Sequence, residues 1–293
     1  MNRIKLFSFI TTVLFFGQSY AQQDASFSFY NYNMNIINPA YVGTGDRIEF
    51  TSTVRSQWVG LEGAPELQSF SLAFPVGPKI GVGLSVTNSN VSVLHETDIT
   101  LDFSYRLQLK EKLDLFLGLK ALGGSIIDID LASLGIVDDP IFTENITTFN
   151  PSFGVGALLK GEDFYINIST PNFLSSRRYE KDSGVVTEAT DNLVFYAGAG
   201  YHLPLGSDDI IFTPSILTRM VSGTPLSADI TGTVSIHDLL DVGINHRLNE
   251  SIGGLVFFKM LDWIKLGYAY DGSISEIGNY SRGNHEVLLK LLL

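Results

Sequence analysis

The sequence predicts an all-β protein, a transmembrane outer-membrane β-barrel of about 14 antiparallel strands with short periplasmic turns and longer external loops. Apolar residues recur at every second position along most of the chain, which is the period of a strand with one apolar face. The mean hydropathy is +0.19, although the formal charge is −12 and only 17% of the residues are charged. The one long apolar run, residues 6–16, lies at the N-terminus. Strands that turn alternate apolar side chains toward lipid explain a hydrophobic average without an apolar run.

Residues 1–21 have the three-part layout of a secretory signal peptide. Arg3 and Lys5 precede the apolar run, and the small residues Ser19 and Ala21 stand at the −3 and −1 positions of a cut after Ala21. A run of eleven apolar residues is too short to cross a bilayer core of ~30 Å as a helix. We therefore expect the chain to leave the cytoplasm, to lose this peptide and to reside in the cell outer membrane.

Residues 22–46 are expected to form an N-terminal lead-in segment that lies in the barrel lumen or reaches the periplasm. Proline disfavours the helical region for the residue before it, so Asn38-Pro39 indicates an extended or turn pair. Gly43 and Gly45 permit positive φ angles just ahead of the first strand. The barrel proper is expected to occupy residues 47–293.

The barrel strands are predicted from alternation and length. From Ile99 to Leu109 apolar side chains occupy every odd position, and these eleven residues match the 9–11 of a tilted transmembrane strand. A soluble strand averages only ~5–6 residues. A soluble two-sheet sandwich is the alternative that alternation alone leaves open. Fourteen segments of this kind begin near Arg47, Glu66, Lys79, Asp98, Lys112, Phe149, Asp163, Asn192, Ile210, Leu226, Leu239, Ser251, Trp263 and Asn284.

The connections between these segments also alternate in length, and an even number of strands leaves both chain ends on the periplasmic side. Short polar turns are expected at residues 77–79, 110–112, 160–163, 206–209, 237–238 and 260–262. Longer links are expected at residues 57–65, 88–96, 125–147, 171–191 and 271–281. Outer-membrane barrels place such longer links outside the cell.

Two sets of side chains follow from this register. Charges of both signs fall on the lumen side, which predicts an internally paired and partly filled lumen: Asp102, Arg106, Asp114, Lys120 and Lys265. Aromatic residues near strand ends are either interfacial girdles or ordinary strand formers: Tyr105, Phe116, Phe164, Tyr165, Tyr201, Phe212, Trp263, Tyr270 and Tyr280.

The sequence offers little chemistry. It has no cysteine, and its histidines (His95, His202, His237, His246, His285) are widely spread rather than at metal-ligand spacing. The Gly-x-Ser-x-Gly nucleophile motif is absent, and 31 acidic against 19 basic residues disfavour nucleic acid. We predict a non-enzyme with no catalytic residue, no cofactor, no metal site and no nucleic-acid partner. An outer-membrane hydrolase would need a nucleophile–base pair that the chain does not present.

Three polar clusters have a functional alternative that we consider weaker than simple solvation. His95 with Glu96 and Asp98 is compatible with acid–base work or a metal in an external loop. Asp128 with Asp130, and Asp138 with Asp139, are compatible with weak Ca²⁺ binding but lack the glycine and distal glutamate of a calcium loop. The basic spot at Arg177, Arg178 and Lys181 is compatible with acidic cargo or lipid head groups.

Two N-terminal motifs carry a family resemblance. Residues 27–43 read FSFYNYNMNIINPAYVG, and residues 55–74 read RSQWVGLEGAPELQSFSLAF. They resemble the opening of the PorP/SprF family, in which an aromatic-rich start precedes Asn-Pro-Ala-Tyr-x-Gly and then Gln-Trp-x-Gly-x-x-Gly-Ala-Pro. Further matching stretches lie at residues 81–85, 153–156, 223–227, 267–271 and 283–286, so the resemblance covers nearly the whole mature chain.

The resemblance implies an outer-membrane component of the type IX secretion system of Bacteroidetes. Such a protein supports the secretion or surface attachment of large adhesins by binding their C-terminal domains, and supports motility in gliding species. The implied partners are a secreted adhesin C-terminal domain, periplasmic type IX secretion components and outer-membrane lipid. The alternative function is a passive outer-membrane channel for small solutes. The motif residues are the candidate partner-binding residues: Asn38, Pro39, Ala40, Gly43, Gln57, Trp58, Gly60, Gly63, Ala64 and Pro65.

Overall fold

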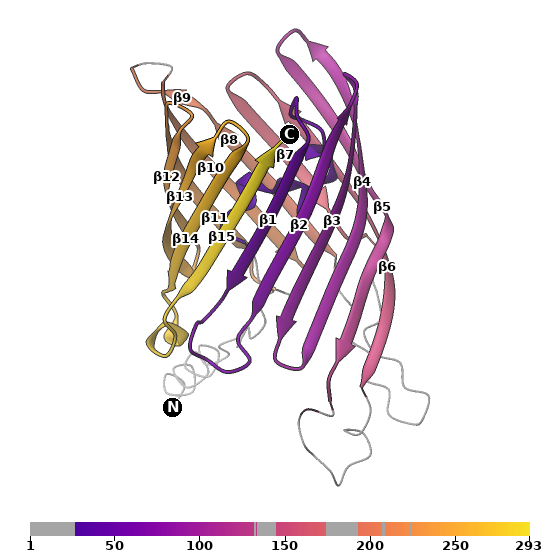
Figure 1. Ribbon diagram of the computed structural model, residues 1–293, viewed down its shortest axis with the longest axis vertical. Coiled ribbons are helices and arrows are strands. Elements are labelled where there is room, and N and C mark those ends of the chain that lie inside the picture. The colour runs from indigo at the N-terminus through magenta and orange to yellow at the C-terminus, as the bar shows by residue number, and fades with distance from the viewer. Residues whose placement is uncertain (1–26, 132, 134–144, 174–192, 207–208, 223) are drawn as a thin grey trace, which may run out of the picture.

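A computed structural model describes residues 27–131, 133, 145–173, 193–206, 209–222 and 224–293, which form one antiparallel β-barrel (Figure 1). The strands are β1 (Glu49–Ser56), β2 (Glu66–Val76), β3 (Ile80–Val91), β4 (Leu94–Lys110), β5 (Leu113–Ile129), β6 (Ile146–Lys160), β7 (Phe164–Thr170), β8 (Val194–Tyr201), β9 (Leu203–Pro204), β10 (Ile210–Val221), β11 (Ser227–Ile236), β12 (Leu240–Arg247), β13 (Ser251–Leu261), β14 (Ile264–Ser273) and β15 (Asn284–Leu292).

The sheet closes on itself. The strands from β1 to β8 pair in chain order, β8 pairs with β10, and the strands from β10 to β15 again pair in chain order. β1 pairs with β15, from Glu49 opposite Leu292 to Ser56 opposite His285. The two-residue strand β9 pairs with β10 beyond the end of β8, so the two together occupy one position in the wall. The described wall is therefore a fourteen-stranded closed barrel, as the alternation predicted.

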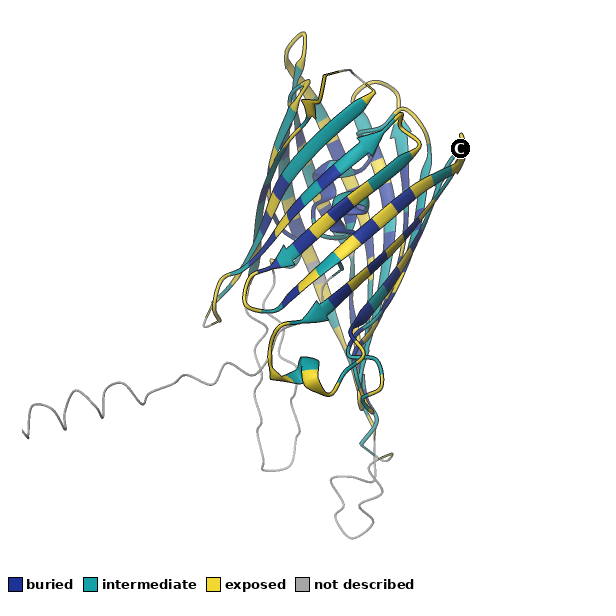
Figure 2. Ribbon diagram, turned by 90° about the vertical axis from the view of Figure 1, so that its left-hand side faces the viewer, coloured by how far each residue is buried: buried dark blue, intermediate teal, exposed yellow. Residues whose placement is uncertain are grey.

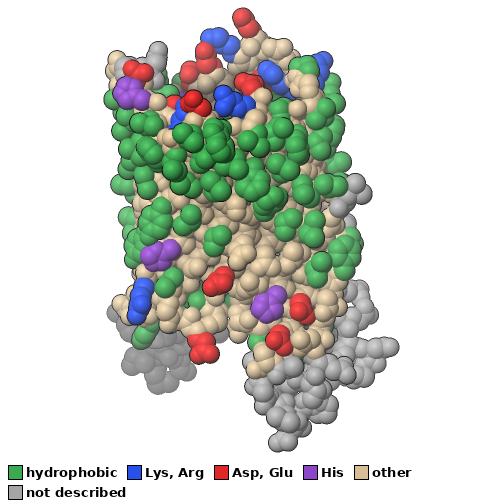
Figure 3. All heavy atoms as spheres, viewed as in Figure 1, with side chains coloured by type: hydrophobic (Ala, Val, Ile, Leu, Met, Phe, Trp, Pro, Cys, Tyr) green, Lys and Arg blue, Asp and Glu red, His purple; other side chains and the backbone are tan. Residues whose placement is uncertain are grey.

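The wall is apolar outside and polar inside. On β4 the side chains of Leu101, Phe103 and Tyr105 are about 40% exposed, whereas Asp102 and Ser104 between them are almost fully buried. Exposed and buried residues alternate in this way along most strands, and the outward side chains form an apolar belt (Figures 2 and 3). This polarity is that of a barrel in lipid and excludes the soluble sandwich. In the described part of the chain, no helix is long and apolar enough to cross a membrane.

The two ends of the barrel differ. At the turn end, which is uppermost in Figure 1, the described connections are short, and the C-terminus lies there too. At the loop end lie the links at residues 57–65 and 274–283, the latter containing the 3₁₀ helix η6 (Glu276–Asn279), together with the ends of β5 and β7 and the starts of β6 and β8.

The link expected at residues 88–96 was wrong. Strand β3 continues to Val91 and β4 begins at Leu94, with Ser92 at φ 53° in the tight turn between them. Asn88 Nδ2 donates to Thr97 Oγ1 at 2.9 Å across the pair. Polar residues on both faces suggested a loop, but here the hairpin continues with polar side chains on its outer face. The longer link expected at residues 125–147 is likewise shortened, because β5 extends to Ile129 and β6 begins at Ile146.

Two of the residues proposed for aromatic girdles face inward. Phe116 is 5% exposed and packs with Ala40 and Leu158, and Tyr165 packs against the same cluster. On β5 the apolar outward set is Leu115, Leu117 and Leu119, so its one aromatic residue belongs to the opposite face.

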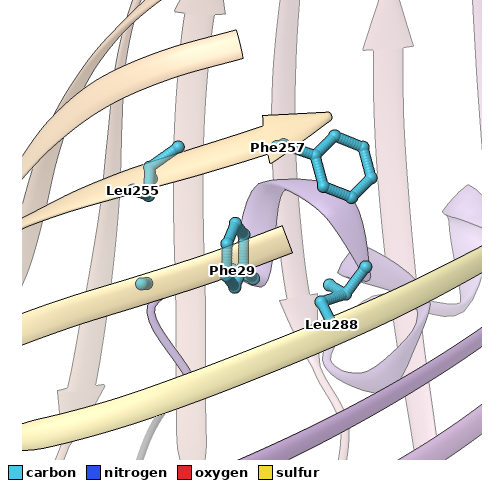
Figure 4. Close-up of a cluster of buried hydrophobic side chains, with 5 residues drawn as sticks. Phe29, Leu255, Phe257 and Leu288 are labelled. Atoms are coloured by element: carbon cyan, nitrogen blue, oxygen red, sulfur yellow. The ribbon is translucent and has the colours of Figure 1, made fainter. Parts of the chain in front are cut away.

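The apolar core of the protein lies inside the barrel. Residues 27–46 are here called the lumen segment. They contain the 3₁₀ helices η1 (Tyr30–Tyr32), η2 (Met34–Ile36) and η3 (Pro39–Tyr41), which lie inside the barrel and are enclosed by its wall (Figures 1 and 2). Phe29 packs with Leu255, Phe257, Ala269 and Leu288 (Figure 4). Further along the segment, two smaller clusters join it to the wall: Tyr30 and Met34 with Leu217, and Ala40 with Phe116 and Leu158.

Candidate functional site: the lumen segment and the rim loop

The lumen segment runs from the loop end toward the turn end. The start of β1 and the end of β15 both lie at the turn end, as an even number of strands requires. The described chain, however, begins at the loop end, so the expectation that both chain ends lie on the periplasmic side was wrong for its N-terminal end. Phe27 and Ser28 contact side chains at the loop ends of β12, β14 and β15. Val42 lies against Gly81 and Ser104, near the short turn that joins β2 to β3. The chain then passes directly into β1. A stretch of fewer than twenty residues thus connects the two ends of the barrel through its interior.

A buried ionic cluster holds the loop end of the segment. Arg55, which is 0% exposed, places Nη1 2.9 Å from Asp271 Oδ1 and 3.1 Å from Glu286 Oε2, and donates to Ser28 Oγ at 2.8 Å. Glu286 also accepts the backbone N–H groups of Ser28 (2.6 Å) and Phe29 (2.9 Å). Buried charges are stable only when paired and hydrogen-bonded, and here the segment's own backbone completes the pairing.

Other charges in the lumen are paired as well. Lys120 lies 2.8 Å from Asp102 and donates to the carbonyl of Asn35 at 3.3 Å, which ties the middle of the segment to the wall. Arg247 lies 2.7 Å from Asp229 and donates to the carbonyl of Phe27 at 3.4 Å. These contacts agree with a lumen of mixed, internally paired charge.

The charges nearer the turn end also form pairs. Arg106 Nη2 is 2.7 Å from Asp114, and Lys265 Nζ is 3.2 Å from Asp238 in the turn between β11 and β12. Partial burial raises the pKa of Asp238, but hydrogen bonds and charge from Lys259 and Lys265 outweigh burial and hold that pKa below its usual value. All five charges predicted for the lumen side therefore have a partner of opposite sign.

The Asn-Pro-Ala motif fixes the segment against the wall. Asn38 is fully buried, its Oδ1 accepts the N–H of Ala40 at 3.0 Å, and its Nδ2 donates to wall carbonyls of Ala157 and Ile168. Asn38 is thus the N-cap of η3, with Pro39 in the first turn, where its missing N–H costs nothing.

Glycines in the wall make this close approach possible. A Cβ on Gly118 would lie 2.2 Å from Ala40 N, and one on Gly156 would lie 2.0 Å from Asn38 Oδ1. Gly81 leaves room for the carbonyl of Val42, to which Ser104 Oγ donates at 2.5 Å. Gly43, at φ +70°, then turns the chain toward β1, as its sequence position indicated.

The second motif forms a braced loop at the rim. In this rim loop, residues 57–65, the Gln57 N–H donates to the Pro65 carbonyl at 2.9 Å. Val59 exchanges backbone hydrogen bonds with the β14–β15 link, and the Gly63 carbonyl accepts from Ser92 in the β3–β4 turn. Trp58 (φ 45°), Gly60 (φ 100°) and Gly63 (φ 70°) all have left-handed or similarly rare backbone angles.

One residue, Asn284, forms hydrogen bonds with both the rim loop and the ionic cluster. Asn284 Oδ1 accepts the Trp58 N–H at 2.8 Å, and Asn284 Nδ2 donates to Asp271 Oδ2 at 2.5 Å. A continuous path of hydrogen bonds therefore leads from the rim loop through Asn284 and Asp271 to Ser28 of the lumen segment. Sequence reasoning did not single out Ser28, Arg55, Asp271, Asn284 or Glu286 as site residues, although all five lie in the stretches that carry the family resemblance.

The other polar clusters give no site in the described residues. No group of three or more His, Asp or Glu side chains there is arranged to hold a metal ion. His95 lies in β4, where its Nδ1 is 2.9 Å from Asn90 Oδ1 across the hairpin. The signal peptide, Asp138 and Asp139, and the basic spot at Arg177, Arg178 and Lys181 lie outside the described residues.

Fold and lumen define the class of this protein as an outer-membrane β-barrel with its own N-terminal segment inside. Over residues 19–291 the chain matches the family described as type IX secretion system membrane protein PorP/SprF. The chain belongs to this family, as the motifs predicted, and it is a type IX secretion membrane component of the outer membrane.

Solved structures with a similar fold are outer-membrane barrels. The Pseudomonas putida toluene transporter TodX aligns with a TM-score of 0.50 at 8% identity, over 89% of this chain and 94% of that one. The Acinetobacter baumannii protein Omp33 aligns at 0.49 and 9% identity, over 86% of this chain and 100% of that one. No curated protein sequence is significantly similar to the chain. At such identities the likeness supports the fold alone.

Proposed function

We propose that this type IX secretion component supports the secretion or surface attachment of large adhesins by binding their C-terminal domains, and that it supports motility in gliding species. The observation that carries the proposal is the family match over nearly the whole chain. Family and fold also suggest a non-enzyme.

The contents of the lumen favour binding over permanent conduction. A passive channel for small solutes needs an open path, whereas here three 3₁₀ helices and three apolar clusters lie between opposite walls. The charges that face the lumen are paired with one another rather than arranged as a ring of one sign.

The candidate partner-binding residues divide into two groups. Asn38, Pro39 and Ala40 are buried against the wall, so we assign them to holding the lumen segment in place. The rim loop stands at the mouth, with Gly60 and Gly63 exposed and Trp58 and Ala64 half-buried. We propose that this loop contacts the adhesin domain, because Trp is enriched at binding hot spots.

The turn end and the outer wall suit the other two partners. The turns that carry Lys79, Lys112 and Asp238 project from the end that faces the periplasm in barrels of this kind, and we propose that periplasmic type IX components dock there. The apolar belt is the surface for outer-membrane lipid.

Deletion of the gene tests the proposal, with surface adhesin measured by immunolabelling of intact cells. We expect surface adhesin to fall sharply; unchanged display would contradict the proposal.

A variant pair tests the rim loop, since the chain has two tryptophans at opposite ends of the barrel. Trp58→Ala is expected to reduce co-purification of the adhesin from outer membranes, and Trp263→Ala, at the turn end, is the matched control. Equal loss in both variants would remove the loop from the interface.

A further inference from the structure

We infer that Ser28, Arg55, Asp271 and Glu286 form a latch on the loop end of the lumen segment, and that the rim loop controls this latch through Asn284. In the latched state the segment stays in the lumen. When the rim loop moves, the loop end of the segment is released while its turn end stays attached.

The two ends of the segment are held by different means. At the turn end, residues 38–42 lie against wall glycines at distances that no side chain would tolerate, and the chain continues covalently into β1. At the loop end, Phe27 and Ser28 are held by side chains of Arg55, Arg247, Asp271 and Glu286. Any displacement of the segment therefore starts at the loop end.

The latch has the properties of a two-state contact. Glu286 is 0% exposed and accepts two successive backbone N–H groups of the segment in addition to its pairing with Arg55. One guanidinium thus serves two carboxylates, and the segment supplies three further donors, because Ser28 Oγ also donates to Asp271. Withdrawal of the segment leaves the carboxylates short of donors together, so intermediate positions are unfavourable.

The rim loop is placed to move the latch. The side-chain amide of Asn284 contacts both the rim loop and the latch. Its Oδ1 accepts a hydrogen bond from Trp58 N, and its Nδ2 donates one to Asp271 Oδ2. Trp58 has a left-handed backbone angle that is sparsely populated for a bulky residue, so contacts around the loop must hold it there. A ligand that repositions residues 57–60 removes a hydrogen bond from Asn284 and thereby loosens Asp271.

Cysteine accessibility in the full chain tests the latch, because the natural chain has no cysteine. Met34→Cys places a thiol in the segment six positions after Ser28, at a site that is 4% exposed. Val42→Cys places a matched thiol at the turn end, at a site that is 0% exposed. The protein is reconstituted in lipid, and the rate of maleimide labelling is measured for each thiol.

We expect Glu286→Gln to speed labelling of Met34→Cys by about tenfold or more, because charge-assisted hydrogen bonds are lost from the latch. Asn284→Ala is expected to speed it less but in the same direction. Val42→Cys should keep its rate in both backgrounds. Lys112→Gln, which breaks an exposed ion pair with Glu162 at the turn end, is the matched control and should change neither rate.

Heat-dependent migration on gels identifies the folded variants, and only these are compared. If Glu286→Gln does not fold, Ser28→Ala carries the test, since it removes one hydroxyl only. Unchanged labelling of Met34→Cys in the folded latch variants would overturn the latch. Equal acceleration at Val42→Cys would overturn the release from one end. An effect of Glu286→Gln without one of Asn284→Ala would overturn control by the rim loop.

Discussion

At the scale of single residues, buried charged side chains and glycines in the wall hold the lumen segment in place. Arg55 lies opposite Glu286 in the β1–β15 ladder, and Asp271 on the next strand completes the set. The wall glycines Gly118 and Gly156 give the segment backbone access that any larger residue would deny. These positions hold the segment more specifically than its apolar contacts do, because hydrogen bonds and close approach are directional.

Arg55→Met is expected to lower the free energy of unfolding by about 3–5 kcal/mol, because two buried carboxylates lose their cation. Urea unfolding of the protein in micelles measures the change. The exposed Lys112–Glu162 pair provides the control, and Lys112→Gln should leave the unfolding midpoint where it was. Equal midpoints for the two variants would show that Asp271 and Glu286 find other partners.

Gly118→Ala is expected to destabilise the protein by about 1–3 kcal/mol, since overpacking forces the backbone of Pro39 and Ala40 away from β5. Gly272→Ala is the matched control, because an added Cβ there meets nothing within 4 Å. Urea unfolding in micelles compares the unfolding midpoints of the two variants. A silent Gly118→Ala would mean that the segment shifts without cost.

At the scale of elements, the two faces of each strand have different partners: the outward side chains face lipid, and the inward side chains contact the lumen. On β4 the outward residues make the apolar belt and the inward residues Asp102 and Ser104 meet Lys120 and Val42. The lumen segment does not pair with a neighbouring element of the chain as the strands do. Its position is held by contacts with the wall strands that surround it.

Phe103→Lys places a charge on the lipid face of β4 and is expected to cost about 2–4 kcal/mol near the bilayer midplane. Asn88→Lys is the control, since its side chain lies near the loop end of β3, beside the polar Thr97. The folding yield and the urea unfolding midpoint in lipid vesicles are measured for both variants. A tolerated lysine at position 103 would place that part of β4 outside the lipid.

The lumen segment is expected to keep the intact protein electrically silent in a planar bilayer. A variant lacking residues 27–42 should conduct steadily if it folds, because the three apolar clusters lose one side. Steady conductance by the full-length protein would instead favour the passive-channel alternative.

At the scale of the whole molecule, the barrel has a direction. Loops at one end and short turns at the other are typical of the outer and the periplasmic side of such barrels, and the lumen segment spans the interior between the two ends. A partner at the rim loop and a partner at the turns would thus act on the same segment.

Cysteines at the two ends test this direction on intact cells. We expect Glu62→Cys, in the exposed part of the rim loop, to react with a membrane-impermeant maleimide. Glu111→Cys, in the β4–β5 turn, should react only after the outer membrane is permeabilised. The reverse pattern would invert the barrel.

The sequence by itself determined the wall. Alternation is a local property, so it identified the fourteen strands, most of their starting positions and the inward charges from Asp102 to Lys265. It failed where the local pattern changes: the polar end of the β3–β4 hairpin read as a loop, and Phe116 read as an outward aromatic.

Only the tertiary structure decided what the wall encloses. Arg55 meets Asp271 and Glu286 across 216 and 231 positions of sequence, and Ser28 meets Glu286 across 258. These contacts exist because β1 pairs with β15 and closes the barrel around the lumen segment. A period of two assigns each side chain to a face, but closure of the sheet decides which inward side chains meet.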